Sequence, residues 1–203
     1  MWNTELSCYR FLAQHVETGW RTLETGAGIS TVLFAAWGCH HLAITPDPSD
    51  AEAAIEYCRI HSIDVSRLRF DLRPSEKALP ELPDDAQFDV FLIDGAHSFP
   101  LPTIDWFYGG SHVRRDGLVV LDDLQLPAVW SLAHSFLEGD NRWEKVGGTS
   151  KWRAYRRRSE GTLAEHEADQ PFYQVQKRAT QRWKERVAVG LKRPIRRVLP
   201  GDG

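Results

Sequence analysis

Two short runs of residues in the middle of the chain hold the side chains best suited to chemistry. The run from Asp94 to His97 reads Asp-Gly-Ala-His and follows one apolar stretch, and Asp122-Asp123 follows the next. Converging carboxylates repel one another unless a cation or shared protons relieve them, and oxygen ligands favour a hard cation such as Mg²⁺. Histidine is the side chain that titrates near neutrality, so His97 could accept a hydroxyl proton. The pattern predicts a metal site at Asp94, Asp122 and Asp123, with His97 as base.

Ordinary structural roles remain open for the same residues. Asp94 could cap the loop after a buried strand, and Asp122 or Asp123 could cap the helix that follows. His97 could be a hydrogen-bonded loop residue. Other polar residues fit packing better than a site: Asp105, Trp106 and Tyr108 at helical spacing, and His40, His41 and His112 without suitably spaced partners.

A second candidate site is the glycine turn from Glu24 to Gly28, which reads Glu-Thr-Gly-Ala-Gly. Its glycines would let the backbone approach a ligand closely. A dinucleotide fingerprint would have a third glycine at position 31, where this chain has Thr31. The Glu24 carboxylate suits a cationic ligand group and is poorly placed beside a pyrophosphate. The alternative is a tight strand-to-helix turn that binds nothing.

Alternating strands and helices would position both candidate sites at one edge of a sheet. Apolar runs predict strands at 21–24, 41–45, 67–71, 88–93 and 117–121. Helices are expected at 5–18, 30–37, 51–61, 103–113 and 128–137, and a hairpin with a glycine-containing loop at 143–146 and 152–156. Such alternation predicts an α/β fold with a Rossmann-like, doubly wound, mostly parallel sheet. Ligands of such sheets bind beyond the carboxyl ends of the strands.

The glycine turn resembles motif I of the class I methyltransferases, which bind S-adenosylmethionine. The resemblance extends over Leu23 to Thr31 and implies that Glu24, Thr25, Gly26, Ala27 and Gly28 bind the cofactor. It also implies cofactor contacts from Asp47 at the ribose, from Ser75 at the adenine and from Asp94. The family usually has its acidic ribose ligand at the position aligned with Thr45, and Asp47 is alternatively a helix N-cap.

The acidic runs resemble the metal-dependent macrolide-sugar O-methyltransferases, a group within that family. In that group the first Asp and the later acidic pair bind Mg²⁺ and the His is proposed as base, which corresponds to Asp94, Asp122, Asp123 and His97. The resemblance covers roughly residues 20–158 and implies methyl transfer to a hydroxyl of a small molecule or sugar. About twenty residues precede the first strand, so the substrate-covering region of many relatives is largely missing. Two alternatives stay open: a non-catalytic methyltransferase-like protein that docks a partner or membrane, and an NAD-linked enzyme.

Charge divides the chain into two parts. Residues 1–150 hold 11 Lys and Arg against 22 Asp and Glu, a net charge of −11, whereas residues 151–203 hold 14 against 6, a net charge of +8. We expect one domain over 1–158 and a basic helical tail over 159–203. The opposite charges favour a tail helix that packs on the acidic domain of its own chain or of a second subunit, and we expect a homo-oligomer. An anionic membrane surface is an alternative, and nucleic acid is less favoured.

The remaining composition indicates a cytoplasmic protein. No basic leader precedes an apolar run at the amino terminus, and no apolar stretch reaches the roughly 18 residues that span a bilayer. The three cysteines, Cys8, Cys39 and Cys58, are scattered and predict buried thiols without a disulfide framework.

Overall fold

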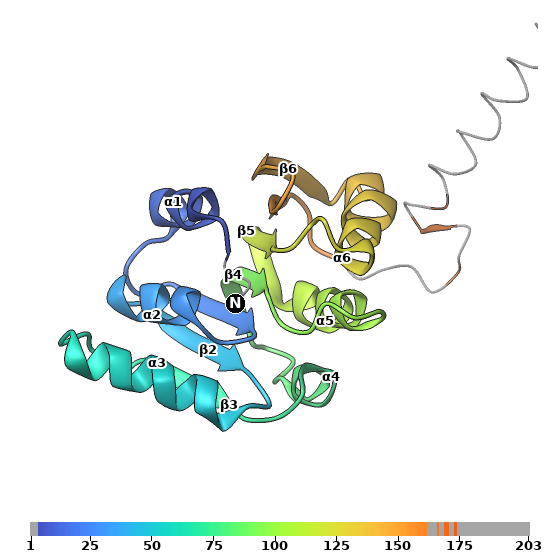
Figure 1. Ribbon diagram of the computed structural model, residues 1–203. Coiled ribbons are helices and arrows are strands. Elements are labelled where there is room, and N and C mark those ends of the chain that lie inside the picture. Colours follow the sequence, from blue (N-terminus) through green and yellow to red (C-terminus); the bar gives the residue numbers. More distant parts are fainter. Residues whose placement is uncertain (1–3, 162–165, 167–168, 171–172, 174–203) are drawn as a thin grey trace, which may run out of the picture. The chain divides into compact units, whose positions relative to one another are not determined.

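The computed structural model describes residues 4–161, 166, 169, 170 and 173. Within them seven strands form one sheet: Arg21–Thr25 (β1), His40–Ile44 (β2), Leu68–Asp71 (β3), Phe88–Ile93 (β4), Val113–Leu121 (β5), Trp143–Gly148 (β6) and Arg153–Arg157 (β7). Their order is β3-β2-β1-β4-β5-β7-β6. The first five are parallel, and β7 runs antiparallel to β5 and β6. The predicted Rossmann-like sheet with a terminal hairpin is confirmed (Figure 1).

Helices cover both faces of this sheet. They are Leu6–His15 (α1), Ile29–Ala36 (α2), Pro48–Ile60 (α3), Ser75–Ala78 (α4), Leu101–Gly109 (α5) and Pro127–Ser131 (α6). α6 continues as a π-helical turn over Leu132–Phe136 and a 3₁₀ turn over Leu137–Gly139. In Figure 1, α1, α2 and α3 lie on one side of the strands, and α4, α5 and α6 lie on the other.

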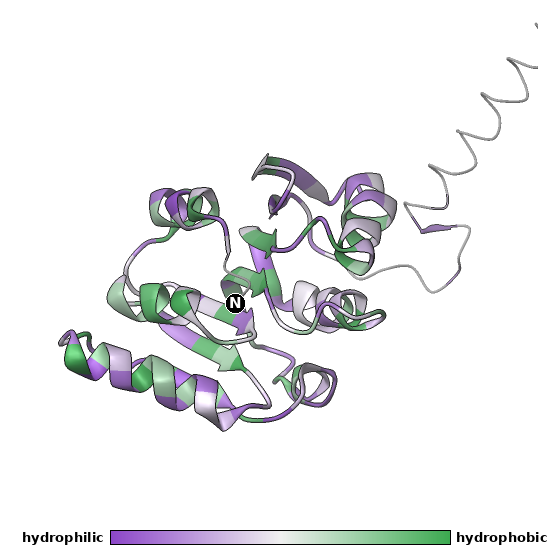
Figure 2. Ribbon diagram, in the orientation of Figure 1, coloured by the Kyte–Doolittle hydropathy of each residue, from purple (hydrophilic) through white to green (hydrophobic). Residues whose placement is uncertain are grey.

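The core is built where the central strands are apolar on both faces. Val90 and Leu92 of β4 pack with Leu118 and Val120 of β5 in a cluster that includes Phe34 of α2. Side chains alternate along a strand, so Phe91 and Ile93 face the opposite layer, and they are equally buried. Figure 2 shows hydrophobic residues along β4 and β5, whereas α3 carries hydrophobic and hydrophilic residues together. Burial on both faces is typical of parallel strands enclosed by helices.

Two predicted boundaries differ from the structure. The helix expected over 103–113 ends at Gly109, a 3₁₀ turn follows over Gly110–His112, and Val113 already belongs to β5, opposite Phe88 of β4. The glycines assigned to the hairpin loop lie in β6 instead, where the register shifts between Lys145 and Gly147. A β-bulge tolerates glycine inside a strand, so these glycines do not mark the turn.

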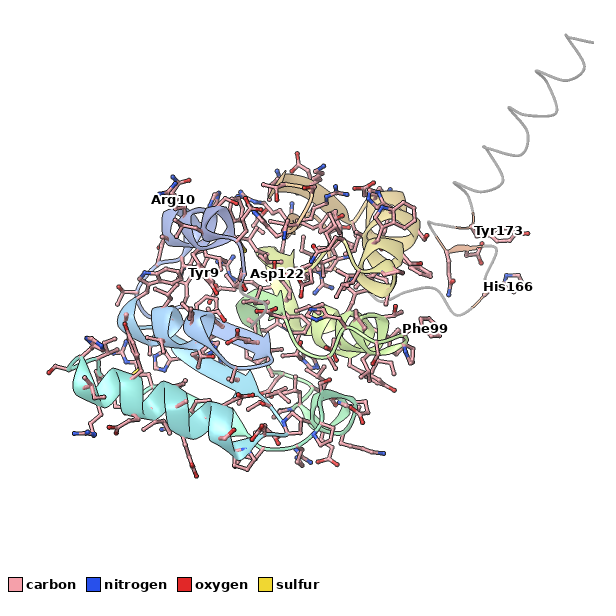
Figure 3. The ribbon with its side chains drawn as sticks, in the orientation of Figure 1. Tyr9, Arg10, Phe99, Asp122, His166 and Tyr173 are labelled. Atoms are coloured by element: carbon pink, nitrogen blue, oxygen red, sulfur yellow. The ribbon has the colours of Figure 1, made fainter. Side chains whose placement is uncertain are left out.

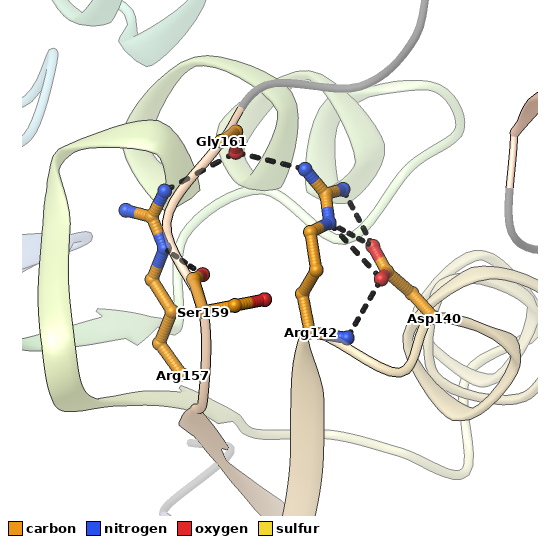
Figure 4. A network of polar contacts seen from close by, with 5 residues as sticks. All are labelled: Asp140, Arg142, Arg157, Ser159 and Gly161. Atoms are coloured by element: carbon orange, nitrogen blue, oxygen red, sulfur yellow. Dashed lines mark hydrogen bonds and ion pairs between the residues drawn. The ribbon is translucent and has the colours of Figure 1, made fainter.

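Two arginines fasten the last described stretch of this domain. Both Arg142 Nη1 and Arg157 Nη2 donate to the backbone oxygen of Gly161, at 2.8 and 3.3 Å, and Arg142 pairs with the buried Asp140 (Figure 4). The chain divides into two units after Thr162, and the first unit contains the whole sheet. The predicted basic tail falls almost entirely outside the described residues. Among those described, no helix has the length and apolar character needed to cross a membrane.

Candidate active site

Three strand ends meet at one edge of the sheet and bring the two candidate sites together. Thr25, the last residue of β1, is in register with Ile93 of β4, and Ile93 is in register with Leu121 of β5. The residues that follow continue this pairing: Asp94 N donates to Thr25 O at 3.1 Å, and Asp122 N donates to Ile93 O at 3.1 Å. The glycine turn and the acidic runs are therefore neighbours in space, as their positions after successive strands predicted.

Gly26 allows the turn to pass directly against the end of β4. Its φ of +96° lies in the left-handed region, and a Cβ added there would come within 2.5 Å of the backbone oxygen of Asp94. Only glycine satisfies both conditions without displacing backbone. The following residues, Ala27 and Gly28, lead into the first turn of α2, and Gly28 N donates to Thr31 Oγ1 at 3.0 Å.

Most of the predicted cofactor residues line one cavity of about 420 Å³, here called the cofactor cavity. They come from the ends of β1, β2, β3 and β4: Thr25, Gly26, Ala27, Asp47, Ser75 and Asp94. Gly28 lines the adjoining cavity, of about 850 Å³, here called the acceptor cavity. Asp94 and Ala27 line both, so the two cavities meet beside the glycine turn.

Glu24 occupies a different place from the other predicted cofactor residues. Its side chain is 1% exposed and lines neither cavity. Its carboxylate accepts hydrogen bonds from Ser30 Oγ, from Thr31 Oγ1 at 2.7 Å and from His41 Nε2 at 3.1 Å. Beneath the turn, Glu24 therefore ties the start of α2 to β2, and direct contact with a cationic ligand group stays a prediction.

Asp47 combines the two roles that the sequence left open. Its Oδ1 accepts from Ser49 N at 2.9 Å, which caps α3, and it also lines the cofactor cavity. Asp50, which sequence reasoning missed, lines the same cavity and accepts from Thr45 Oγ1 at 3.3 Å. Asp50 lies in the first turn of α3, and this turn faces the cavity. Its position at the start of the helix was the sequence feature that could have indicated a role in the site.

Asp94, His97 and Asp123 form the tightest polar group at this edge. His97 Nε2 lies 3.9 Å from Asp94 Oδ1, and His97 Nδ1 lies 3.5 Å from Asp123 Oδ2. One ligand atom from each of the three lies within 4.8 Å of the others. Asp122, predicted as the third carboxylate ligand, is 3% exposed and lies beside this group rather than in it.

The crowding of carboxylates shifts their titration. Burial, then the neighbouring charges of Asp122 and Glu24, raise the pKa of Asp94 to about 8. Burial likewise raises the pKa of Asp122. Among the described residues His97 Nε2 is buried and has no hydrogen-bond partner. The site therefore combines clustered carboxylates with an unsatisfied imidazole nitrogen: a cation would relieve the repulsion between the carboxylates, and a bound hydroxyl group could hydrogen-bond to the nitrogen.

The amino-terminal segment supplies residues that sequence reasoning missed. Thr4 Oγ1 donates to Asp94 Oδ2 at 3.0 Å, and Thr4 and Tyr9 both line the acceptor cavity. Burial raises the pKa of Tyr9 to about 12, with contributions from Asp94 and Asp122; Tyr9 and Asp122 lie close together in Figure 3. Nothing in the local pattern of α1 signals this contact, which depends on how the helix packs.

Contacts to the terminal hairpin hold α1 in that position. Thr149 Oγ1 donates to Glu5 Oε2 at 2.8 Å, and Trp152 Nε1 donates to Ser7 Oγ at 2.7 Å. Although few residues precede β1, α1 and the segment before it thus contribute to the wall of the acceptor cavity.

Comparisons with known proteins agree with this geometry. Residues 23–124 match the model of a methyltransferase domain family, and no curated protein matches the sequence. Among solved structures, a candidate O-methyltransferase from Klebsiella pneumoniae is similar, with a TM-score of 0.62 and 18% identity over 77% of this chain and 82% of that one. An O-methyltransferase from Streptomyces achromogenes involved in tomaymycin synthesis, in complex with SAM, has a TM-score of 0.58 and 19% identity over 73% and 77% of the two chains.

A candidate rRNA methylase from Clostridium thermocellum has the same fold, with a TM-score of 0.62 and 10% identity over 79% of this chain and 99% of that one. At these identities the similar structures show the fold that they share with this chain. The family match covers the glycine turn, the acidic runs and the strand ends that line the cofactor and acceptor cavities. The chain belongs to the methyltransferase domain family and is an S-adenosylmethionine-dependent methyltransferase.

Proposed function

We propose that this methyltransferase acts on a hydroxyl group of a small organic molecule or sugar, with His97 as general base and with assistance from Mg²⁺. The observation that supports it most directly is the imidazole of His97 between Asp94 and Asp123, at 3.9 and 3.5 Å. Histidine flanked by two carboxylates at the mouth of a cavity is suited to accept a proton and to be stabilised once protonated.

The donor set fits a hard divalent cation. Asp94 and Asp123 offer carboxylate oxygens, Asp122 adds negative charge nearby, and oxygen donors are those that Mg²⁺ prefers. Asp94 and Asp123 would hold the ion, with Asp122 as a further carboxylate. When bound, such an ion lowers the pKa of a hydroxyl group that it contacts. Because Asp94 lines both cavities, this charge lies where cofactor and acceptor would meet.

The chain's own residues would perform the remaining tasks. The glycine turn and Asp47 hold the cofactor, and the acceptor cavity holds the substrate with its hydroxyl beside His97. The acceptor oxygen would take the methyl group that S-adenosylmethionine supplies, and the proton of that hydroxyl would pass to a ring nitrogen of His97. The sulfonium is already activated, so alignment and deprotonation are the protein's main contributions.

The lining of the acceptor cavity favours a compact acceptor with an apolar surface. Away from the acidic end, its walls are Ile29, Val32, Leu33, Ala36, Ala53 and Tyr57. A volume of about 850 Å³ is within the range of small-molecule sites. The similar O-methyltransferase from Streptomyces achromogenes is involved in tomaymycin synthesis, which supports methyl transfer to oxygen on a small molecule. A homo-oligomer, a membrane-docked tail and a cytoplasmic location remain proposals from the sequence.

Calorimetric titration with S-adenosylmethionine, with and without Mg²⁺, tests the proposal together with methyl transfer to a panel of catechols, phenols and sugars. We expect the wild type to bind the cofactor at micromolar concentration and His97→Gln to bind it equally while losing about 10²-fold or more of its turnover. Asp94→Asn with Asp123→Asn should abolish Mg²⁺ binding, and Asp84→Asn, on an exposed loop, is the matched control.

The outcomes separate the alternatives. Cofactor binding with no turnover on any hydroxylated acceptor would favour the alternative that this chain is a non-catalytic or accessory protein. Full turnover in His97→Gln would exclude His97 as base, and unchanged activity after chelation would exclude an obligatory metal.

A further inference from the structure

A third cavity lies at the opposite end of the sheet from the cofactor cavity. It has a volume of about 690 Å³ and is lined by the amino ends of β1, β2 and β3 and by the loop that precedes β4. Three arginines, Arg21, Arg67 and Arg69, line it together with His40 and the buried His41. Its other wall is apolar and includes Leu42, Leu82 and Ala86. Here it is called the basic cavity.

Strand register explains why the basic side chains gather there. Arg21 is paired with His40 across β1 and β2, and Leu42 is paired with Arg69 across β2 and β3. Paired residues of neighbouring strands point to the same face, and so do residues two apart on one strand. Arg21, His40 and Arg69 therefore share one face of the sheet with Leu42. In the described chain the β3–β4 connection supplies only α4 and a 3₁₀ turn over Leu79–Glu81, both shorter than the helices on the other face.

Within the described part of the chain, the arginines of this cavity form no ion pair with a carboxylate. In residues 4–161, ion pairs join Arg59, Arg73, Arg114, Arg142, Arg153 and Arg158 to acidic groups, but none involves Arg21, Arg67 or Arg69. Arg67 Nη1 donates to Gly38 O at 3.0 Å, and Arg69 Nη1 donates to Ser66 O and Leu68 O, both at 2.8 Å. Backbone carbonyls thus orient two guanidinium groups without neutralising them.

Nearby acidic residues are already engaged. Asp89 accepts from Arg21 N and pairs with Arg114, so it does not neutralise the Arg21 side chain. Asp64 accepts from Ser66 N and Ser66 Oγ, and the charge of Arg67 helps to lower its pKa, so Asp64 offsets part of the charge of Arg67 without forming an ion pair with it. Among the described residues, three arginines thus gather without an ion pair in a part of the chain with a net charge of −11, an arrangement that stability alone does not require.

We propose that the basic cavity binds a phosphorylated small molecule, with the phosphate on the arginines and an apolar group against Leu42, Leu82 and Ala86. Guanidinium groups fit phosphate oxygens with paired N–H donors. A compact monoester fits better than a nucleic acid, because the site is concave and the surrounding domain repels an extended polyanion. No residue that lines the basic cavity also lines the cofactor or acceptor cavity, so the three sites are separate.

Calorimetric titration of the full chain with phenyl phosphate, with S-adenosylmethionine present in excess, tests the proposal. The excess cofactor keeps its own cavity occupied, so the measured heat reports another site. We expect one phenyl phosphate per chain and at least about tenfold weaker binding of inorganic phosphate. The double variant Arg67→Gln with Arg69→Gln should bind phenyl phosphate at least about tenfold more weakly.

Two further variants separate the loss of a phosphate contact from the loss of stability or of charge in general. Arg21→Gln alters a side chain for which the described residues show no hydrogen bond or ion pair, so it should weaken binding without lowering the melting temperature. Arg10→Gln, which removes a charge that projects outward from α1 (Figure 3), should bind like the wild type. No heat with the wild type, or an equal loss in Arg10→Gln, would overturn the proposal. Tighter binding of a short oligonucleotide than of phenyl phosphate would replace it with a nucleic-acid surface.

Discussion

Asp105 of α5 is completely buried and belongs to neither the proposed catalytic group nor a described ion pair. Among the described residues neither of its carboxyl oxygens has a hydrogen-bond partner of good geometry. Burial raises its pKa to about 6, although the hydroxyls of Ser75 and Thr25 are near enough to oppose the shift. Thr25 and Ser75 line the cofactor cavity, so Asp105 lies directly behind it. Helical spacing predicted that Asp105 packs within the crossover helix, but it did not indicate the free-energy cost of burying its carboxyl group.

Stability should depend on pH through Asp105. Its pKa is raised on folding, so the folded state holds a proton that the unfolded state releases, and stability falls as pH rises from about 4 to about 6. Asp105→Asn removes this ionisation and should raise the free energy of unfolding at pH 7 by about 1–3 kcal/mol, with little gain at pH 4. Urea unfolding from pH 4.5 to 7.5 measures the difference, with the exposed Asp84→Asn as control. A gain that is the same at every pH would contradict it.

The strand-to-helix turn is the element on which the site depends. Gly26 fits it to the backbone at Asp94, while Glu24 fixes the start of α2 through Ser30 and Thr31. The turn is therefore a rigid connection between β1, β4 and α2, and its shape does not depend on a ligand being bound.

Gly26→Ala should damage this element more than a conformational preference alone explains. The new Cβ would meet the Asp94 carbonyl at 2.5 Å at a φ of +96°, so we expect a loss of about 2–4 kcal/mol and at least tenfold weaker cofactor binding. Gly19→Ala is the matched control, because φ is +87° and no atom lies within 4 Å of the added Cβ. It should cost about 1 kcal/mol and leave binding intact. Unfolding midpoints and calorimetry measure both, and equal effects would show that the contact is unimportant.

At the scale of the whole molecule, all seven described strands and the three cavities lie within residues 4–161. The hydrogen bonds to Gly161 come at the end of this region, three residues beyond the predicted boundary at 158. The remaining residues, 162–203, bring most of the positive charge of the second part of the chain.

A chain shortened to residues 1–161 should fold and bind S-adenosylmethionine as the full chain does, because its core and strand ends are intact. Thermal unfolding should remain a single transition with an unchanged midpoint. Sedimentation of both chains tests the proposed homo-oligomer, since loss of the basic residues should weaken self-association at low salt. A lower midpoint or lost cofactor binding would show that residues beyond 161 support the domain.

The sequence predicted those features of the fold and the site that depend on interactions over a few residues. Local patterns determined the alternation of elements, the sheet class and the order of strand ends, because hydrophobic periodicity and glycine turns act over a few residues. They therefore placed Gly26, Asp94, His97 and Asp123 at one edge. Only the tertiary structure decided that Glu24 is buried beneath the turn, that Thr4 and Tyr9 reach the site, and that Arg21 and Arg69 share a cavity. Those outcomes depend on helix docking and strand register between residues distant in the chain, which no local spacing encodes.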